Sequence, residues 1–377
     1  MAAIVVLFHI VLLPGCEVPQ TVFDVEINVL GTNARITIIG LSDAEAREAA
    51  VAVEQDLRKL DHVGYTFKPE GELYELNEAI ARGGSMRVSP ELKDLINTAK
   101  KMYTASGGLI NPAAGELIAL WEFHCEEQDC DESPFPEEVR QLVVNKEKEV
   151  IGAKPSMSDL IITGDVVSSV NPAVKLEFGD MIRGYALDKG IAHLKKMDIK
   201  NAMINIGGSV RSVGSRGEHP WWAAVMDVSG IHSIGYVELG KDEAVVTVRA
   251  FDQSIGKQDY IYRHVVDPRT GLPVKDVKAV TVIHESAVWA NAAATTLLIA
   301  GIDDWASIAA KMGVLAEDVW IQQLIAECHA YSVHQVRILR RRFAPKTKQE
   351  RHMGRVRMTP HGVSGSTTPD SASNTGR

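Results

Sequence analysis

Six short apolar segments between residues 202 and 283 place the tightest constraint on how this chain can fold. Each is rich in β-branched or aromatic residues, and glycine-containing turns separate them: "AMINI", "WWAAVMDV", "IGYVEL", "AVVTVRAF", "YIYRHVV" and "AVTVI". Segments of this length and composition are typical of β-strands. The connections are too short for the helical crossovers that join parallel strands, so we expect a largely antiparallel arrangement.

The N-terminal half begins with two strands and continues with helices. The stretch "VFDVEINVLGTNARITIIG" alternates apolar and polar residues on both sides of Gly31-Thr32, which predicts two strands that meet at a turn or bulge. Ser42 and Glu45 form a capping box, and apolar residues then recur at helical spacing. A second helix is predicted from Ser89, its N-cap, to the Gly107-Gly108 pair.

Two further helices are predicted, one from about Arg183 to Met197 and one from Ser286 to about Ala300, ended by Gly301. Helices in the first half and strands with short turns in the second predict an α+β fold with mostly antiparallel sheets and packed helices. A dinucleotide-binding fingerprint is excluded, because Gly207-Gly208 follows a strand without the required third glycine and helix start.

The net charge of −9 is unevenly distributed along the chain. Residues 337–377 carry ten Lys/Arg and two Asp/Glu, a charge of +8, so the remaining residues carry −17. A body this acidic lacks the basic face that nucleic-acid binding requires, which argues against DNA or RNA as a partner. The basic region 336–377 has little apolar periodicity, and we expect a disordered tail. Contact of its arginine cluster with an anionic membrane is the alternative.

The first 16 residues, "MAAIVVLFHIVLLPGC", predict an export signal. The apolar stretch from Ala2 to Leu13 is too short to span a bilayer but fits a secretory signal, and residues 13–16 are similar to a bacterial lipobox. On this interpretation Cys16 is acylated, and the protein is anchored by lipid to the inner membrane in the bacterial periplasm. A buried N-terminal strand is the alternative. Cys125 and Cys130 are candidates for a disulfide in an oxidising compartment or, more weakly, for a metal site with His124.

The stretch "YIYRHVVDPRTGLPV" raises a functional question, because a histidine stands where a predicted strand ends in a tight turn. Asp267, Pro268 and Gly271 supply the acceptor, the fixed φ and the permitted positive φ that a turn needs. His264 therefore lies near the exit of a strand, where polar groups often face a cleft, and its ring titrates near neutrality. A partly exposed strand histidine without a chemical role is the alternative.

Five segments, taken in order and spacing, carry a family resemblance. They are "FKPEGELYELN" (67–77), "LINPAAGELIALW" (109–121), "LEFGDMIRGYALD" (176–188), "INIGGSVR" (204–211), and "HVVDPRTG" followed by "VWANAAATTLLIAG" (288–301). Together they resemble the ApbE-like family of FAD:protein FMN transferases, over about Phe23 to Val314. The resemblance implies an ApbE-like (T-fold-like) architecture and a flavin transferase domain at residues 17–320.

The resemblance also implies a cation site on the last predicted helix. Asn291 and Thr295 are four residues apart, so their oxygen-bearing side chains lie on one helix face, as two ligands of a hard cation must. Family members have a metal-binding Asp and Thr at these positions, so Asn291 implies a weaker Mg²⁺ site. A backbone carbonyl of the family's glycine-rich loop corresponds to that of Ile182. Without the resemblance, two small polar residues packed against their neighbours would be the simpler interpretation.

The residues that the resemblance assigns to FAD are Asn77, Glu177, Arg183, Gly207, Gly208, Thr247 and Asp267. Glu177 and Arg183 replace the Asp and Lys of the family's loop and preserve their charges, although an Arg contacts phosphate with a different geometry. Asp180 replaces a glycine of the same loop. Thr247 remains of a Thr-Ser-Gly motif and is followed here by Val248-Arg249.

The implied reaction moves FMN from FAD to a threonine hydroxyl of an acceptor redox protein, with Mg²⁺, and releases AMP. Such transfer depends on positioning and charge neutralisation, and His264 is the implied general acid or base. Two alternatives follow from the substitutions at the metal and phosphate end. One is a divergent protein that binds FAD with little transferase activity, and the other is an Mg²⁺-dependent FAD pyrophosphatase in which water replaces the threonine.

Overall fold

The computed structural model describes residues 21–64, 71–120, 155–227, 233–250, 252–255, 260–263, 265–274 and 277–323. The helices are α1 (Asp43–Gly64), α2 (Glu72–Ala81), α3 (Pro90–Ala105), α4 (Gly115–Leu120), α6 (Gly179–Lys196) and α7 (Ala287–Lys311), with short 3₁₀ turns η1 (Met157–Asp159) and η2 (Ala316–Asp318). The strands are β1 (Val22–Val29), β2 (Thr32–Ile39), β3 (Ser85–Arg87), β4 (Leu160–Thr163), β5 (Val166–Ser169), β6 (Ala202–Ile206), β7 (Ser209–Val213), β8 (Trp221–Met226), β9 (Ser233–Leu239), β10 (Ala244–Arg249), β11 (Asp252–Ile255), β12 (Tyr260–Arg263), β13 (Val266–Asp267), β14 (Leu272–Pro273), β15 (Val277–His284) and β16 (Val319–Gln323).

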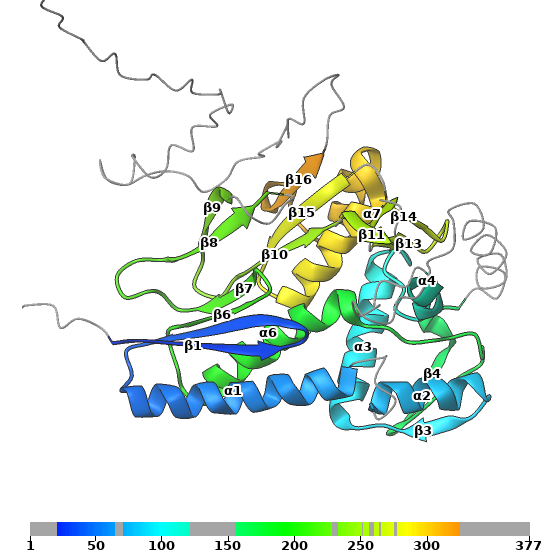
Figure 1. The fold of residues 1–377 in the computed structure, drawn as a ribbon, viewed down its shortest axis with the longest axis horizontal. Helices are drawn as coiled ribbons and strands as arrows, with labels where there is room; N and C mark the ends of the chain where they lie inside the picture. Colours follow the sequence, from blue (N-terminus) through cyan, green and yellow to red (C-terminus); the bar gives the residue numbers. More distant parts are fainter. Residues whose placement is uncertain are drawn as a thin grey trace, which may run out of the picture.

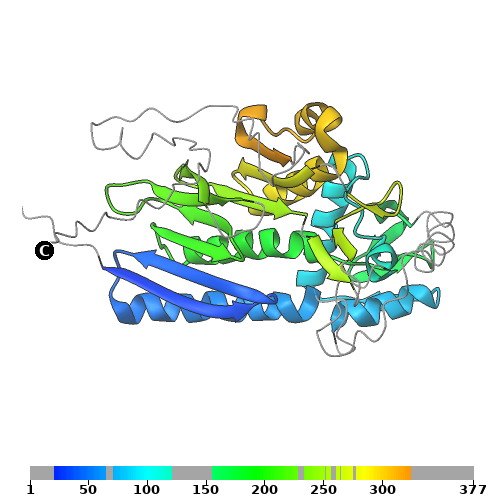
Figure 2. The same cartoon turned by 45° about the horizontal axis from the view of Figure 1, so that its top comes forward.

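A seven-stranded antiparallel sheet in the order β1-β2-β6-β7-β10-β15-β16 forms the centre of the molecule (Figure 1). Three helices cover one of its faces: α1 packs against β1 and β2, α6 against β6 and β7, and α7 against β10 and β15. Figure 2 shows α1 and α6 running side by side beneath the strands. The main hydrophobic core lies between these helices and the sheet. The predicted α+β class with antiparallel sheets is confirmed.

The opposite face of the sheet is covered by the β8–β9 ribbon. Trp221 is the large anchor of this second, smaller core, which also includes Val210 and Val245 from the sheet. The Trp221 indole Nε1 donates a hydrogen bond to the Val213 carbonyl at 3.2 Å, so its one polar atom is satisfied within the apolar cluster. Since neighbouring residues Val245 and Val246 belong to different cores, both faces of β10 are buried.

A smaller layer lies beyond the end of the central sheet, where α2 and α3 accompany the three-stranded sheet β3-β5-β4 (Figure 1). Its helix starts follow local rules. Ser89 caps α3 by accepting a hydrogen bond from the Leu92 amide at 3.2 Å, with Pro90 in the first turn. The predicted capping box of α1 is also present, with the Ser42 amide donating to Glu45 at 3.1 Å.

The structure differs from the sequence prediction at the start of α6, in the strand at 260–266 and at β16. Helix α6 begins at Gly179, four residues before the predicted start, so Ile182 is a helical residue. The predicted interruption at Gly301 is present, since the chain leaves helical geometry there (φ 77°, ψ −175°), and a second helical stretch then follows to Lys311. The predicted strand at 260–266 is divided between β12 and β13. Strand β16 was not predicted from the sequence. It pairs with β15 and continues the central sheet to Gln323, three residues beyond the end of the implied domain at residue 320.

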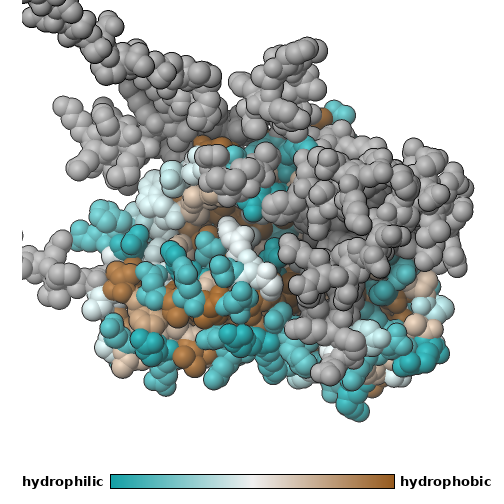
Figure 3. All heavy atoms as spheres, in the orientation of Figure 1, coloured by the Kyte–Doolittle hydropathy of each residue, from teal (hydrophilic) through white to brown (hydrophobic). Residues whose placement is uncertain are grey.

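The surface is mixed in character. Hydrophilic and hydrophobic side chains are interspersed over the β1–β2 hairpin and α1 in the space-filling view (Figure 3). An exposed ion pair between Arg35 and its cross-strand neighbour Glu26 lies on this hairpin. None of the helices within the described ranges is both long and apolar enough to cross a membrane.

The crossing of α6 and α7 gives the first prediction. A Cβ atom at Gly184 would lie 2.6 Å from the Ala287 carbonyl oxygen and 2.8 Å from the Val288 Cα, both backbone atoms that cannot rotate away. We expect Gly184→Ala to lower the free energy of unfolding by about 1–3 kcal/mol, as overpacking does. Gly235→Ala is the control, because nothing lies within 4 Å of its Cβ position. Equal denaturation midpoints for the two variants would contradict this.

Candidate functional site

The loop that leads into α6 is held by side chains and backbone from distant parts of the chain. Asn77 donates from Nδ2 to the Leu176 carbonyl at 2.9 Å and accepts at Oδ1 from the Leu176 amide at 2.7 Å. The Glu177 amide donates to the Pro112 carbonyl at 2.9 Å. Asn77 is buried, and its amide oxygen is engaged by this backbone. The structure therefore shows Asn77 as an anchor of the loop, and its assignment to FAD stays a prediction.

Glu177 stands two residues before α6. Its Oε1 accepts a hydrogen bond from the Gly179 amide at 2.6 Å, which satisfies one of the free amides of the first turn. A Cβ at Gly115 would lie 2.8 Å from the Cβ of Glu177, so the glycine permits the 109–115 segment to run close beside the loop. These contacts bring together two of the five segments recognised in the sequence.

The Asp267–Gly271 turn is a self-contained hydrogen-bonded unit. The Asp267 carboxylate accepts from the Arg269 amide at 2.8 Å and forms an ion pair with its guanidinium, also at 2.8 Å. The hydrogen bond with Asp267 raises the pKa of Arg269. The Gly271 amide donates to the Asp267 carbonyl at 2.8 Å, and the φ of Gly271 is 72°. Arg269 Nη2 also reaches the Ile299 carbonyl of α7 at 3.4 Å. The carboxylate predicted to meet FAD is thus occupied in shaping the turn and docking it on α7.

Helix α7 presents the two predicted cation ligands from its buried face. Asn291 is 6% exposed and Thr295 2% exposed. The Thr295 hydroxyl oxygen is buried and has no hydrogen-bond partner, whereas the next threonine, Thr296, donates to the Ala292 carbonyl at 2.7 Å. A buried hydroxyl without a partner is costly and calls for an explanation.

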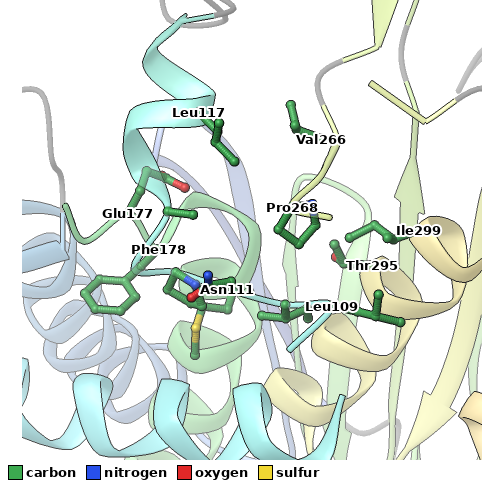
Figure 4. Close-up of a pocket in the computed structure, with 13 residues that line it drawn as sticks. Leu109, Asn111, Leu117, Glu177, Phe178, Val266, Pro268, Thr295 and Ile299 are labelled. Atoms are coloured by element: carbon green, nitrogen blue, oxygen red, sulfur yellow. The ribbon is translucent and has the colours of Figure 1, made fainter. Parts of the chain in front are cut away.

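A cavity of about 60 Å³ lies where these elements meet. Figure 4 shows Glu177 and Phe178 on one side and Pro268, Thr295 and Ile299 on the other. The full lining is Leu109, Ile110, Asn111, Pro112, Ala114, Leu117, Glu177, Phe178, Met181, Val266, Pro268, Thr295 and Ile299. Three of the five segments recognised in the sequence therefore line one cavity, and a fourth, 67–77, holds its loop through Asn77.

The remaining predicted residues lie elsewhere or outside the described residues. His264 belongs to the latter, as does the side chain of Asp180. Gly207 and Gly208 form the β6–β7 hairpin turn with φ of 58° and 90°, and neither lines the cavity. The Thr247 hydroxyl is 2.8 Å from that of Thr281, its cross-strand neighbour. Their assignment to FAD stays a prediction.

Arg183 and Ile182 are both on α6. Arg183 is exposed. Burial lowers the pKa of the Arg249 guanidinium, and Arg183 acts in the same direction, so the two groups are within electrostatic reach of each other. The resemblance assigns the carbonyl of Ile182 to the cation, but Ile182 lies inside α6. In a regular helix that carbonyl accepts the amide four residues later, so its role as a cation ligand needs a shared or broken bond.

Sequence reasoning missed the polar residue Asn111, although its segment was recognised. Its Nδ2 donates to the Pro155 carbonyl at 2.8 Å and its Oδ1 accepts from the Ala113 amide at 3.3 Å. The Asn-Pro pair of "LINPAAG" was the available signal, since this pair marks a turn. The described residues contain no group of three His, Cys, Asp or Glu side chains arranged for a metal ion.

The profile of the ApbE family matches residues 30–316. The chain belongs to the ApbE family. A FAD:protein FMN transferase of Rhodobacter capsulatus is 35% identical over 304 residues, which cover 80% of this chain and 55% of the relative, so the chain spans about half of that protein. A FAD:protein FMN transferase of Vibrio cholerae is 26% identical over 307 residues, which cover 79% of this chain and 87% of the relative.

Solved structures of ApbE proteins share the fold. The ApbE protein of Thermotoga maritima has a TM-score of 0.68 at 24% identity, with 81% of this chain and 94% of that chain covered. The apo flavinyl transferase ApbE of Pseudomonas stutzeri has a TM-score of 0.69 at 21% identity, with 83% and 94% covered. The predicted ApbE family and architecture are confirmed.

The anchor of the ApbE loop gives the second prediction. Asn77→Ala removes both partners of the Leu176 backbone, and we expect a loss of about 1–3 kcal/mol in the free energy of unfolding because buried polar groups are left unpaired. Chemical denaturation measures this. Glu75→Ala, on the exposed face of the same helix, is the control and should stay within about 0.5 kcal/mol of the unmodified protein. A neutral Asn77→Ala variant would show that the loop does not depend on this anchor.

Proposed function

We propose that this ApbE protein transfers the FMN moiety of FAD to a threonine hydroxyl of an acceptor redox protein, releases AMP, and uses Mg²⁺. The names of its relatives support the reaction class: FAD:protein FMN transferase at 35% and 26% identity. The convergence of three family segments on one cavity supports the location of the site. We also propose that the protein works in the periplasm, attached to the inner membrane through a lipid on Cys16, on the basis of its lipobox-like N-terminus.

The observation that carries the cation site is the Thr295 hydroxyl. It is buried, has no hydrogen-bond partner and lines the cavity, which is what a ligand awaiting its ion requires. Asn291 lies one turn earlier on the same helix, and amide and hydroxyl oxygens are donors that Mg²⁺ accepts. The residues present therefore fit the ion. When bound, it would neutralise the diphosphate of FAD and so favour attack on phosphorus.

The size of the cavity agrees with a site that holds an ion and leaves most of FAD outside. A volume of about 60 Å³ accommodates a few water molecules, each of which needs about 10–15 Å³. Pockets for whole organic ligands are several times larger. The cavity is thus on the scale of an ion with its ligands, beside a dinucleotide that lies mainly outside it.

The threonine Oγ of the acceptor forms a bond to the phosphorus of the FMN half, and the bond from that phosphorus to the bridging oxygen breaks, so AMP leaves with that oxygen. The threonine proton passes to a base, for which we propose His264. The Asp267–Gly271 turn, docked on α7 through Arg269, supports this assignment because it fixes the chain just after the histidine.

Two other functions share the same site. Asn291 lacks the charge that relatives with an Asp would bring, which favours a protein that binds FAD without transferring it. A FAD pyrophosphatase would use the same ion with water as the attacking group. Incubation of the purified protein with FAD, Mg²⁺ and a flavin-accepting domain separates the three. A fluorescent acceptor plus AMP indicates the transferase, FMN plus AMP the hydrolase, and unchanged bound FAD the binding protein.

The third prediction concerns His264. We expect His264→Ala to abolish flavin transfer to the acceptor, because the attacking hydroxyl loses its base, while FAD binding changes little. In-gel fluorescence of the acceptor measures transfer, and FAD fluorescence quenching measures binding. His219→Ala serves as the control, since this histidine lies in the turn before β8. Transfer at the unmodified rate in the His264 variant would remove this residue from the mechanism.

The fourth prediction concerns Thr295. Thr295→Val keeps the shape of the side chain and removes the unpartnered hydroxyl, so without cation we expect equal or higher thermal stability. The same variant should lose the stabilisation that Mg²⁺ and FAD together give the unmodified protein. Thermal unfolding with and without both ligands measures this, and Thr296→Val is the matched control on the neighbouring position. If Thr295→Val gained as much from Mg²⁺ as the unmodified protein does, Thr295 would not be a ligand.

A further inference from the structure

The side chain of Asp188 on α6 binds the first turn of α7, almost one hundred residues later in the sequence. Its Oδ1 accepts from the Ala287 amide at 2.7 Å, and its Oδ2 accepts from the Val288 amide at 3.2 Å and from the Ser286 hydroxyl at 2.7 Å. Ser286 in turn accepts from the Trp289 amide at 3.3 Å. Three successive free amides of the helix start are thus satisfied through one carboxylate and one hydroxyl.

The charge of Asp188 suits this position. A carboxylate at a helix N-terminus interacts favourably with the helix dipole, and hydrogen bonds to a charged acceptor are stronger than neutral ones. Asp188 also forms an ion pair with Arg211 of β7, and the two side chains are only 18% and 12% exposed. Arg211 reaches Asp242 at 3.2 Å as well, so it keeps an acidic neighbour when Asp188 is changed.

A second contact, one turn earlier on α6, fixes the same junction between α6 and the first turn of α7. Gly184 faces the backbone of Ala287 and Val288 so closely that no side chain fits between the helices. Because each turn of a helix spans 3.6 residues, Asn291 lies about one turn beyond Ala287 and Thr295 about one turn further. The contact between the two helices therefore determines where both oxygens stand relative to Glu177, just before α6, and Ile182, in its first turn.

We propose that Asp188 is a positioning residue for flavin transfer, because it sets the place of the α7 oxygen donors relative to the loop that begins α6. The inference rests on the proposed function, since it concerns the cation that Asn291 and Thr295 are proposed to hold. Asp188 does not touch the cavity and takes no part in the chemical step. Its effect is on the affinity for the ion.

The test compares Asp188→Asn with the unmodified protein in titrations with Mn²⁺, in the presence of FAD, with free Mn²⁺ followed by electron paramagnetic resonance. Asparagine keeps one acceptor oxygen but loses the charge and the second acceptor. We expect the dissociation constant for Mn²⁺ to rise about tenfold to hundredfold, as it does when residues that orient metal ligands are changed. In transfer assays, high Mg²⁺ should restore most of the lost rate, because binding rather than chemistry is impaired.

Ser89→Ala is the matched control, because it removes the cap of α3, a helix that contributes no proposed ligand. It should lower the melting temperature and leave Mn²⁺ affinity unchanged. Ser286→Ala is the second variant, in case Asp188→Asn does not fold, and should weaken Mn²⁺ binding in the same direction. Unchanged Mn²⁺ affinity in both the Asp188 and Ser286 variants would overturn this inference alone. Absence of Mn²⁺ binding by the unmodified protein would overturn the cation site and this inference with it.

Discussion

The close crossing of α6 and α7 is the constraint on which the rest of the site depends. Both helices lie on the same face of the central sheet, and each brings one half of the candidate site: the loop with Glu177 precedes α6, and the oxygen donors stand on α7. Gly184 permits the approach, since a Cβ there would overlap the α7 backbone. Tight packing of backbone against backbone tolerates little displacement, so the relative position of the two halves is well determined.

The loop before α6, which carries Glu177, depends on contacts with residues that are distant in the sequence. Asn77 on α2 holds Leu176, and the 109–115 segment runs beside the same loop with Gly115 in close contact. Polar groups buried in this way specify one arrangement, because any other would leave them without partners. The small layer of α2 and α3 therefore supports the loop before α6 from outside, while the large sheet supports α7.

Local sequence patterns predicted the elements well and their ends less well. The capping residues Ser42 and Ser89 act through hydrogen bonds within three residues, so their positions could be recognised without tertiary structure. The start of α6 at Gly179-Asp180 could not, because glycine and aspartate are poor helix formers and Glu177 supplies the missing acceptor. Strand β16 was also missed, since its short segment becomes a strand only by pairing with β15.

The site likewise combines features that local sequence reveals with contacts that only the tertiary structure reveals. The i, i+4 spacing of Asn291 and Thr295 is local information, and the structure places both on the buried face of α7. The partnership of Asp188 with Ser286 spans 98 positions and no periodicity reveals it. Asn77 and Asp267 were recognised as important residues, but the structure shows their polar atoms bound to the protein itself.

The charge balance of the cavity bears on the substitution of Asn291. An Asp at that position would bring a negative charge to the cation, and asparagine does not. Glu177 still borders the cavity that Thr295 lines, so the site retains a carboxylate. One oxygen of that carboxylate accepts the Gly179 amide at 2.6 Å, which holds the side chain beside the first turn of α6. At the proposed cation site the carboxylate would therefore come from the α6 side, and the ion would depend on both helices together rather than on α7 alone.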